Sequence, residues 1–211
     1  MARSPLRVVV QTARTQPAIF LSASVPDPRR DKVYHNTTDV TAIRAAVSAF
    51  VKVVLGRHHL VWGGHPSITP MIWLIAKGLE LDYGKTVTIY QSRFFKDDFP
   101  AENKQFKNVV HTPAVRNDED ASLAEMRQRM LSEWTYQAGV FIGGMEGVEE
   151  EFRLFQKLQP NAKILPVAST GGAALRLYES GNFPAELKSD LTYLSLFRKV
   201  LDLPPSPRTR S

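Results

Sequence analysis

The chain has 211 residues, of which 43% are hydrophobic and 23% charged, a composition typical of one compact globular domain and unlike disordered or fibrous proteins. It contains no cysteine, which excludes disulfides, thiolate metal sites and cysteine nucleophiles. The formal net charge of +6 would suit an anionic ligand, but the basic residues are scattered along the chain, so nucleic-acid binding is not favoured.

No apolar run approaches the roughly 20 residues that a helix needs to cross a bilayer, and polar residues interrupt the N-terminal segment where a signal peptide would be apolar. We therefore expect a cytoplasmic protein with no membrane partner. We expect residues 1–17 to form an N-terminal extension, residues 18–203 one folded domain, and residues 204–211 a disordered tail rich in proline and serine.

Short apolar segments alternate with segments of helical periodicity along the chain. The apolar segments predict buried strands at 18–24, 59–64, 86–92, 108–114, 138–144 and 162–169. The periodic segments predict helices from Asp39 to about Gly56 and at about 68–81, 119–135, 147–158, 171–180 and 187–202, with a long loop at 24–38. Because parallel strands need crossover connections, this alternation predicts an α/β fold: a Rossmann-like, mostly parallel sheet with helices on both faces, which binds ligands at the carboxyl ends of its strands.

Turns of small residues follow four of the predicted strands, at what would be one edge of the sheet. The candidate binding residues in these turns are Ser22, Ser24, Gly63, Gly64, His65, Ser67, Gly143, Gly144, Met145, Glu146, Gly147, Thr170, Gly171 and Gly172. Glycine lets a ligand approach the backbone, and a helix N-terminus offers unpaired N–H groups with a partial positive charge, so phosphate is the natural ligand. One such turn is often purely structural, but four at one edge predict a phosphate-binding site.

Glu151 stands out in the acidic stretch after the third of these turns. On the helix predicted there, Glu151 falls on the same side as the apolar residues Val148 and Phe155. The preceding Glu149 and Glu150 point outward and are predicted to be a solvated face. A carboxylate on the inner side of the first turn suits hydrogen bonding to ribose hydroxyls or assistance at an anomeric carbon.

The remaining candidates carry weaker signals. Arg93 follows the third predicted strand, where it either holds a phosphate or belongs to a solvated loop. The five histidines have no metal-binding spacing, so neither a metal site nor a cofactor is predicted, although His65 could contact a ligand. Trp134, at the end of a predicted helix, is interpreted as a core residue or as a contact with a second subunit.

Four segments, FLSAS, VWGGHPSITPMI, MRQRMLSEW and VFIGGMEGVEEEF, resemble in this order the SLOG superfamily, which includes the LOG phosphoribohydrolases and the DNA-processing protein DprA. LOG enzymes carry a Met-x-x-Arg motif and a Pro-Gly-Gly-x-Gly-Thr-x-x-Glu motif. The matching residues, with one extra residue between the glycines of the second motif, are Met126 and Arg129, then Gly143, Gly144, Gly147 and Glu151. The resemblance implies that Arg129 and Glu151 act at a ribose phosphate, and that they are the catalytic residues if the protein is an enzyme.

Ile142, Val148 and Met130 stand where LOG enzymes have proline, threonine and lysine, so the chain looks more like the SLOG branch found with TIR, sirtuin and channel proteins of bacterial antiviral defence. That resemblance implies a nucleotide-binding sensor for a signal derived from NAD or ADP-ribose, acting as a homodimer or higher homo-oligomer on a separate effector protein. One alternative is an enzyme, a LOG-like nucleoside 5′-monophosphate phosphoribohydrolase. A third reading is single-stranded DNA binding of the DprA type.

Overall fold

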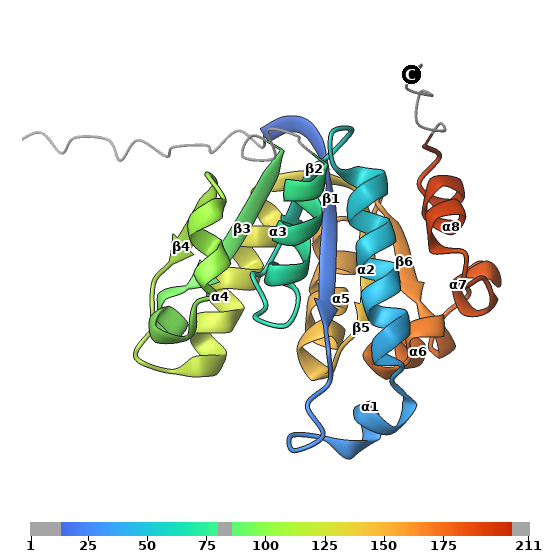
Figure 1. Ribbon diagram of the computed structural model, residues 1–211. Helices are drawn as coiled ribbons and strands as arrows, with labels where there is room; N and C mark the ends of the chain where they lie inside the picture. The colour runs from blue at the N-terminus through green and yellow to red at the C-terminus, as the bar shows by residue number, and fades with distance from the viewer. Residues whose placement is uncertain (1–13, 80–85, 204–211) are drawn as a thin grey trace, which may run out of the picture.

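The structure, a computed structural model, describes residues 14–79 and 86–203 (Figure 1). Its centre is a six-stranded sheet in the order β4-β3-β2-β1-β5-β6, in which all neighbouring strands run parallel. The strands are β1 (Arg14–Ser24), β2 (His59–Trp62), β3 (Val87–Ser92), β4 (Val109–Thr112), β5 (Trp134–Gly143) and β6 (Lys163–Val167). The predicted single α/β domain with a Rossmann-like parallel sheet is confirmed. The predicted tail and residues 1–13 of the predicted extension lie outside the described residues.

Helices cover both faces of this sheet (Figure 1). Helices α2, α3 and α8 pack on one face and α4 and α5 on the other, each set with its own apolar core. The helices are α1 (Lys32–Thr37), α2 (Val40–Val54), α3 (Thr69–Gly78), α4 (Glu119–Ser132), α5 (Glu146–Leu158), α6 (Gly172–Glu179), α7 (Glu186–Ser189) and α8 (Tyr193–Val200). All residues of β2 and β3 are buried, as expected for inner strands of a parallel sheet that is covered on both faces.

The predicted start of α2 is confirmed. The Asp39 carboxylate accepts a hydrogen bond from the backbone N–H of Ala42 at 2.8 Å, which satisfies one of the free donors of the first turn. The apolar stripe of this helix is buried in the core, and Gly56 follows its end with a φ of 80°. Capping and amphipathic spacing therefore fix this helix between β1 and β2, whose turns of small residues lie at the edge of the sheet.

Two segments differ from the prediction. The predicted loop at 24–38 contains the short helix α1, because the Asp31 carboxylate caps it by accepting a hydrogen bond from a first-turn N–H at 2.7 Å. The predicted helix at 187–202 is two helices, α7 and α8. They are separated by a turn in which the Thr192 N–H donates to Asp190 Oδ1 at 2.7 Å. In both places an aspartate side chain accepts a hydrogen bond from the backbone N–H two residues later, and the apolar spacing of the sequence does not predict such a contact.

The helix predicted at 119–135 ends at Ser132, and Trp134 is the first residue of β5. The Trp134 indole is buried, stacks on His59 with ring centres 4.2 Å apart, and donates a hydrogen bond to Tyr90 Oη at 3.0 Å. The core interpretation of Trp134 is therefore confirmed, whereas its placement on a helix is wrong, because its aromatic and β-branched neighbours favour a strand.

The chain changes direction across the sheet next to β1. From β1 it proceeds outward through β2, β3 and β4, and it then returns to the other side of β1 to form β5 and β6. In a parallel sheet, the carboxyl ends of strands at such a reversal flank a crevice in which ligands bind. The part of the chain that the structure describes has no helix long and apolar enough to cross a membrane.

Candidate functional site

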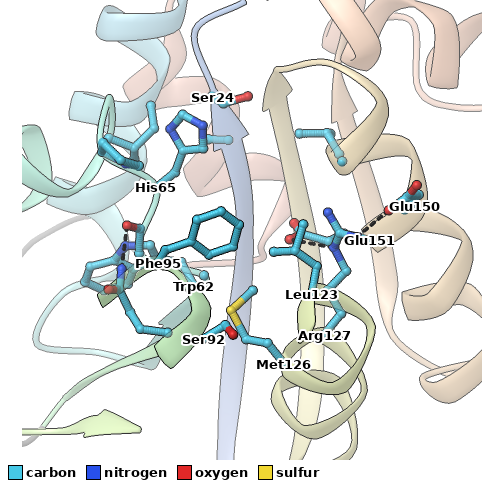
Figure 2. A pocket seen from close by; sticks show the side chains of 18 of the residues that line it. Ser24, Trp62, His65, Ser92, Phe95, Leu123, Met126, Arg127, Glu150 and Glu151 are labelled. Atoms are coloured by element: carbon cyan, nitrogen blue, oxygen red, sulfur yellow. Dashed lines mark hydrogen bonds and ion pairs between the residues drawn. The ribbon is translucent and has the colours of Figure 1, made fainter. Parts of the chain in front are cut away.

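A cavity of about 450 Å³ opens at the carboxyl edge of the sheet, between the ends of β1, β2 and β3 and the first turns of α4 and α5 (Figure 2). Three of the four predicted turns reach this cavity. The predicted residues that line it are Ser24, Gly63, Gly64, His65, Met145, Glu146, Gly147 and Glu151. Residues far apart in the sequence thus meet at one concave site, where the reversal of strand order predicts ligand binding.

Glu151 faces into this cavity from α5. Ser22 Oγ donates a hydrogen bond to Glu151 Oε2 at 2.5 Å, and Arg127 Nε lies 3.7 Å from Glu151 Oε1. Only 14% of the Glu151 side chain is exposed. Burial raises the pKa of Glu151, and the Arg127 charge and the Ser22 hydrogen bond oppose this increase only in part. The site therefore holds one desolvated carboxylate in a fixed orientation.

Gly63 lies opposite this carboxylate at the end of β2. A Cβ atom added to Gly63 would stand 3.7 Å from Glu151 Oε1 and 3.5 Å from the methyl group of Met126. Because Gly63 has no side chain, a space about the size of one methyl group remains beside the Glu151 carboxylate, which is enough for a single ligand atom such as a hydroxyl oxygen. The glycine turn after β2 and the acidic first turn of α5 are separate motifs in the sequence. In the structure they lie on opposite sides of one narrow gap.

The arginine beside Glu151 is Arg127, and the structure does not bring Arg129 to the cavity. The guanidinium of Arg127 donates to Glu150 through Nη1, and its Nε points toward Glu151 with no hydrogen-bond partner among the described residues. The Arg129 side chain turns away and donates from Nε to Glu133 Oε1 at 2.7 Å. Arg127, and not Arg129, is therefore the arginine of α4 that lies beside Glu151.

The sequence also contained evidence that Arg127 faces the cavity, which was overlooked because the Met-x-x-Arg motif matched Arg129. Leu123 and Arg127 are four residues apart, so they share one face of α4, and both line the cavity. Met126 lies beside them in the cavity lining, whereas Arg129 projects from another part of the helix. Helical spacing from Leu123 would have selected Arg127 as the arginine of α4 that faces the cavity.

The turn after β2 is held open by a buried amide network. Gln91 donates from Nε2 to the Gly64 carbonyl oxygen at 2.7 Å, and its Oε1 accepts from Asn103 Nδ2 at 2.9 Å. Next to this turn the His65 ring is exposed at the cavity, yet the surrounding protein and the charge of Arg30 lower the pKa of His65. His65 is therefore neutral at pH 7, and its ring can accept or donate a hydrogen bond.

Free backbone donors face the cavity from two turns. Among the described residues, no group accepts a hydrogen bond from the N–H of Gly64, His65, Glu146 or Gly147. Glu146 and Gly147 are the first residues of α5, where the positive end of the helix dipole lies. These four N–H groups can receive a phosphate or hydroxyl oxygen.

The other predicted glycines build the wall behind the cavity, and the structure contradicts their assignment as phosphate donors because their N–H groups already have partners. Gly143 donates to Thr170 Oγ1 at 2.9 Å, and Gly144 donates to the Ser24 carbonyl oxygen at 2.9 Å. Gly171 donates to the Ala168 carbonyl oxygen at 3.0 Å, and Gly172 donates to Thr37 Oγ1 at 3.2 Å. The turn after β6 is thus filled by the end of α1, and Thr170 is fully buried.

Three further predicted residues lie next to the cavity or outside it. Ser22 supports Glu151 from behind, and Ser67 Oγ accepts the Val25 N–H at 3.2 Å and contacts the His65 ring. Arg93 is exposed at the start of the 3-10 helix η2 (Arg93–Asp98) and does not line the cavity. Within residues 14–79 and 86–203, no group of histidines and carboxylates could hold a metal ion.

Comparison with known proteins places this architecture in a family. The model of the SLOG cluster3 family matches residues 33–201, a span that contains the cavity-lining turns after β2 and β5. The chain belongs to the SLOG cluster3 family. Membership of the SLOG superfamily implies binding of a nucleotide-related ligand. No curated protein matches the chain.

In this SLOG domain, Gly63→Ala is expected to fill the site without disturbing the fold. The new methyl group would meet its neighbours at 3.5 to 3.9 Å, which is ordinary van der Waals contact. We expect the free energy of unfolding in urea to change by less than about 1 kcal/mol. Ligand binding should be lost, because the methyl group stands between the Gly63 backbone and Glu151. Strong binding by a well-folded variant would show that the ligand does not enter this gap.

The raised pKa of Glu151 predicts a pH-dependent stability difference between the wild type and Glu151→Gln. Because the folded protein binds this proton more tightly than the unfolded chain does, the stabilisation from protonation is complete below the unfolded pKa of about 4.3 and is lost as pH rises through the folded pKa. We therefore expect the variant to have the higher melting temperature at pH 7 to 8, with the difference shrinking toward pH 4.

Thermal unfolding of both proteins across this pH range measures the effect. A variant that is less stable than the wild type at pH 7 to 8, by an amount that shrinks as the pH falls, would mean that Arg127 stabilises the Glu151 charge more than burial disfavours it. A difference that does not change with pH would mean that the pKa of Glu151 is not shifted by folding.

Proposed function

We propose that this SLOG domain binds a nucleotide-derived ligand of the NAD or ADP-ribose type in the cavity at the carboxyl edge. The observation that carries the proposal is the arrangement around Glu151: a fixed, buried carboxylate lies beside Arg127 and the free N–H groups of the first turn of α5. A carboxylate accepts hydrogen bonds from ribose hydroxyls, and the helix N-terminus and the arginine attract a phosphate. One ribose phosphate would satisfy both groups.

The charges of the cavity lining limit the number of phosphates. Two arginines line it, Arg30 and Arg127, against six carboxylates: Asp98, Glu119, Asp120, Glu146, Glu150 and Glu151. This excess of negative charge disfavours a polyphosphate and a DNA backbone, which need a positive groove. A ligand with one or two phosphates meets less repulsion than a longer phosphate chain, and the volume of about 450 Å³ is within the usual range of small-molecule sites.

The second candidate is the phosphoribohydrolase reaction, and the raised pKa of Glu151 favours it. A carboxyl group whose pKa is moved toward neutrality can exchange protons at an anomeric carbon. In this reaction water would add to C1′ of the nucleoside monophosphate, the N-glycosidic bond would break, and the base would leave with a proton. Glu151 would position the ribose and move the proton, while Arg127 would hold the 5′-phosphate.

Product analysis distinguishes a sensor from an enzyme. The purified protein and Glu151→Gln are incubated with AMP, ADP-ribose, cyclic ADP-ribose isomers and NAD, and the mixtures are separated by chromatography after a thermal-shift measurement. The proposal expects a higher melting temperature with an ADP-ribose relative that is recovered intact. Free base released from AMP by the wild type and not by Glu151→Gln would establish the enzyme. The absence of any shift or product would contradict both candidates.

We extend the proposal to signalling in antiviral defence: a homodimer or higher homo-oligomer of this domain would pass the ligand signal to a separate effector protein. The support is the resemblance of the SLOG motifs to the branch found with TIR, sirtuin and channel proteins. Light scattering with and without the ligand would test the oligomeric part, which a monomer under both conditions would contradict.

A further inference from the structure

The side of the cavity across from Glu151 is aromatic and apolar. Phe95, Phe99 and Pro100 line it, together with Trp62 at the end of β2. Figure 2 shows Phe95 across the cavity from the group formed by Arg127, Glu150 and Glu151. The cavity therefore has a charged wall on the β5 side and an aromatic wall on the β3 side.

The backbone after β3 holds Phe95 in this position. Ser92 Oγ caps η2 by accepting the Phe94 N–H at 3.3 Å, and the helix is interrupted at Phe95, whose φ and ψ are −100° and 25°. The Phe94 ring supports Phe95 edge-on, with ring centres 5.0 Å apart and planes inclined by 75°. Phe95 remains half-buried, with part of its ring exposed to the cavity.

An exposed aromatic surface inside a cavity is stabilised by an apolar or aromatic group that covers it. In a nucleotide, the group joined to the ribose is a planar heterocyclic base, and bases stack on aromatic side chains. With the ribose at Glu151 and the phosphate at the start of α5, the base has to extend away from the charged wall, and the aromatic wall lies across the same cavity.

We propose that Phe95 is the base-stacking residue of this site and determines its preference for nucleotides over bare sugar phosphates. The inference rests on the proposed function, since it assumes that a ribose phosphate is bound at Glu151 and Arg127. It assigns the aromatic wall a role that neither the glycine turns nor the SLOG motifs contain, because Phe95 lies outside all of them.

Calorimetric titration of AMP and ribose 5-phosphate into the wild type, Phe95→Ala and Phe95→Tyr tests the role of Phe95. Phe95→Ala is expected to weaken AMP binding about tenfold or more, the usual effect of removing one stacked ring, and to leave the affinity for ribose 5-phosphate within about twofold. Phe95→Tyr keeps the ring and should retain AMP binding.

Each other outcome has a separate meaning. Unchanged AMP binding by Phe95→Ala, or an equal loss for both ligands, would overturn the inference and leave the proposed function intact. A wild type that binds ADP-ribose but neither AMP nor ribose 5-phosphate would also overturn the inference, and one that binds none of the three would contradict the proposed function itself. Melting temperatures of the three proteins show whether a loss of affinity reflects unfolding.

Discussion

Arg127→Ala is expected to weaken the binding of AMP or ADP-ribose by about tenfold to a hundredfold, the effect of losing a hydrogen bond to a charged group. The reason is that the Arg127 side chain lines the cavity, is only 13% exposed, and holds Nε 3.7 Å from Glu151 Oε1, where Nε has no hydrogen-bond partner among the described residues. A phosphate or ribose oxygen that enters beside Glu151 would meet this guanidinium. Calorimetric titration at fixed ionic strength measures the change in affinity.

Arg129→Ala is the matched control, because it removes the same charge from the same helix two residues away. Arg129 is paired with Glu133 outside the cavity, and Glu133 also accepts a hydrogen bond from Tyr90 Oη at 2.7 Å. We expect this variant to lose some thermal stability and to keep its ligand affinity within about twofold. The reverse result, with binding lost in Arg129→Ala and kept in Arg127→Ala, would mean that the sequence motif identifies the functional arginine and the geometry does not.

Gly171→Ala is expected to destabilise the protein by about 3 kcal/mol or more, as measured by unfolding in urea. Gly171 has a φ of 70° and a ψ of −158°, a conformation that only glycine adopts readily. An added Cβ would also stand 1.8 Å from the carbonyl oxygen of Thr37, so the end of α1 would have to move away from this turn. Both effects act on a backbone contact that has no flexible side chain to absorb the clash.

Gly78→Ala is the control for this change, since an added Cβ there would meet nothing within 4 Å. Gly78 is the last residue of α3, and alanine has the higher helix propensity, so we expect this variant to be as stable as the wild type or more stable by up to about 1 kcal/mol. A Gly171→Ala variant as stable as Gly78→Ala would contradict the packing of α1 against the turn after β6.

The sequence predicted the fold well because buried parallel strands and amphipathic helices have different apolar periods. The inward position of Glu151 followed from the same periodicity, and Asp39 was recognisable as a cap. The predicted helix boundary near Trp134 was wrong because a helix ends and a strand begins there with almost no linker between them. Short capped helices such as α1 were not predicted because they contain too few apolar residues to show a helical period.

The glycine turns show which feature of the site could not be predicted from the sequence. Gly63 and Gly171 have the same sequence context, since each belongs to a Gly-Gly pair that follows a strand. In the structure, however, Gly63 faces the cavity, whereas Gly171 is covered by the backbone of Thr37. What covers a glycine is decided by a distant segment of the chain, and a single sequence does not pair such segments. The position of Phe95 in the cavity lining was not predicted for a similar reason, because only the turn of the backbone after β3 brings its ring into the cavity.

The central claim is that a nucleotide binds in the cavity and places one of its ribose hydroxyl oxygens in the gap between Gly63 and Glu151. Titration of ADP-ribose into the wild type and Gly63→Ala tests this claim most directly. We predict saturable binding at one site per wild-type chain, and no binding by a Gly63→Ala protein that unfolds in urea as the wild type does. Equal affinity of the two proteins for ADP-ribose would contradict the claim, because it would place the ligand outside the gap that this methyl group fills.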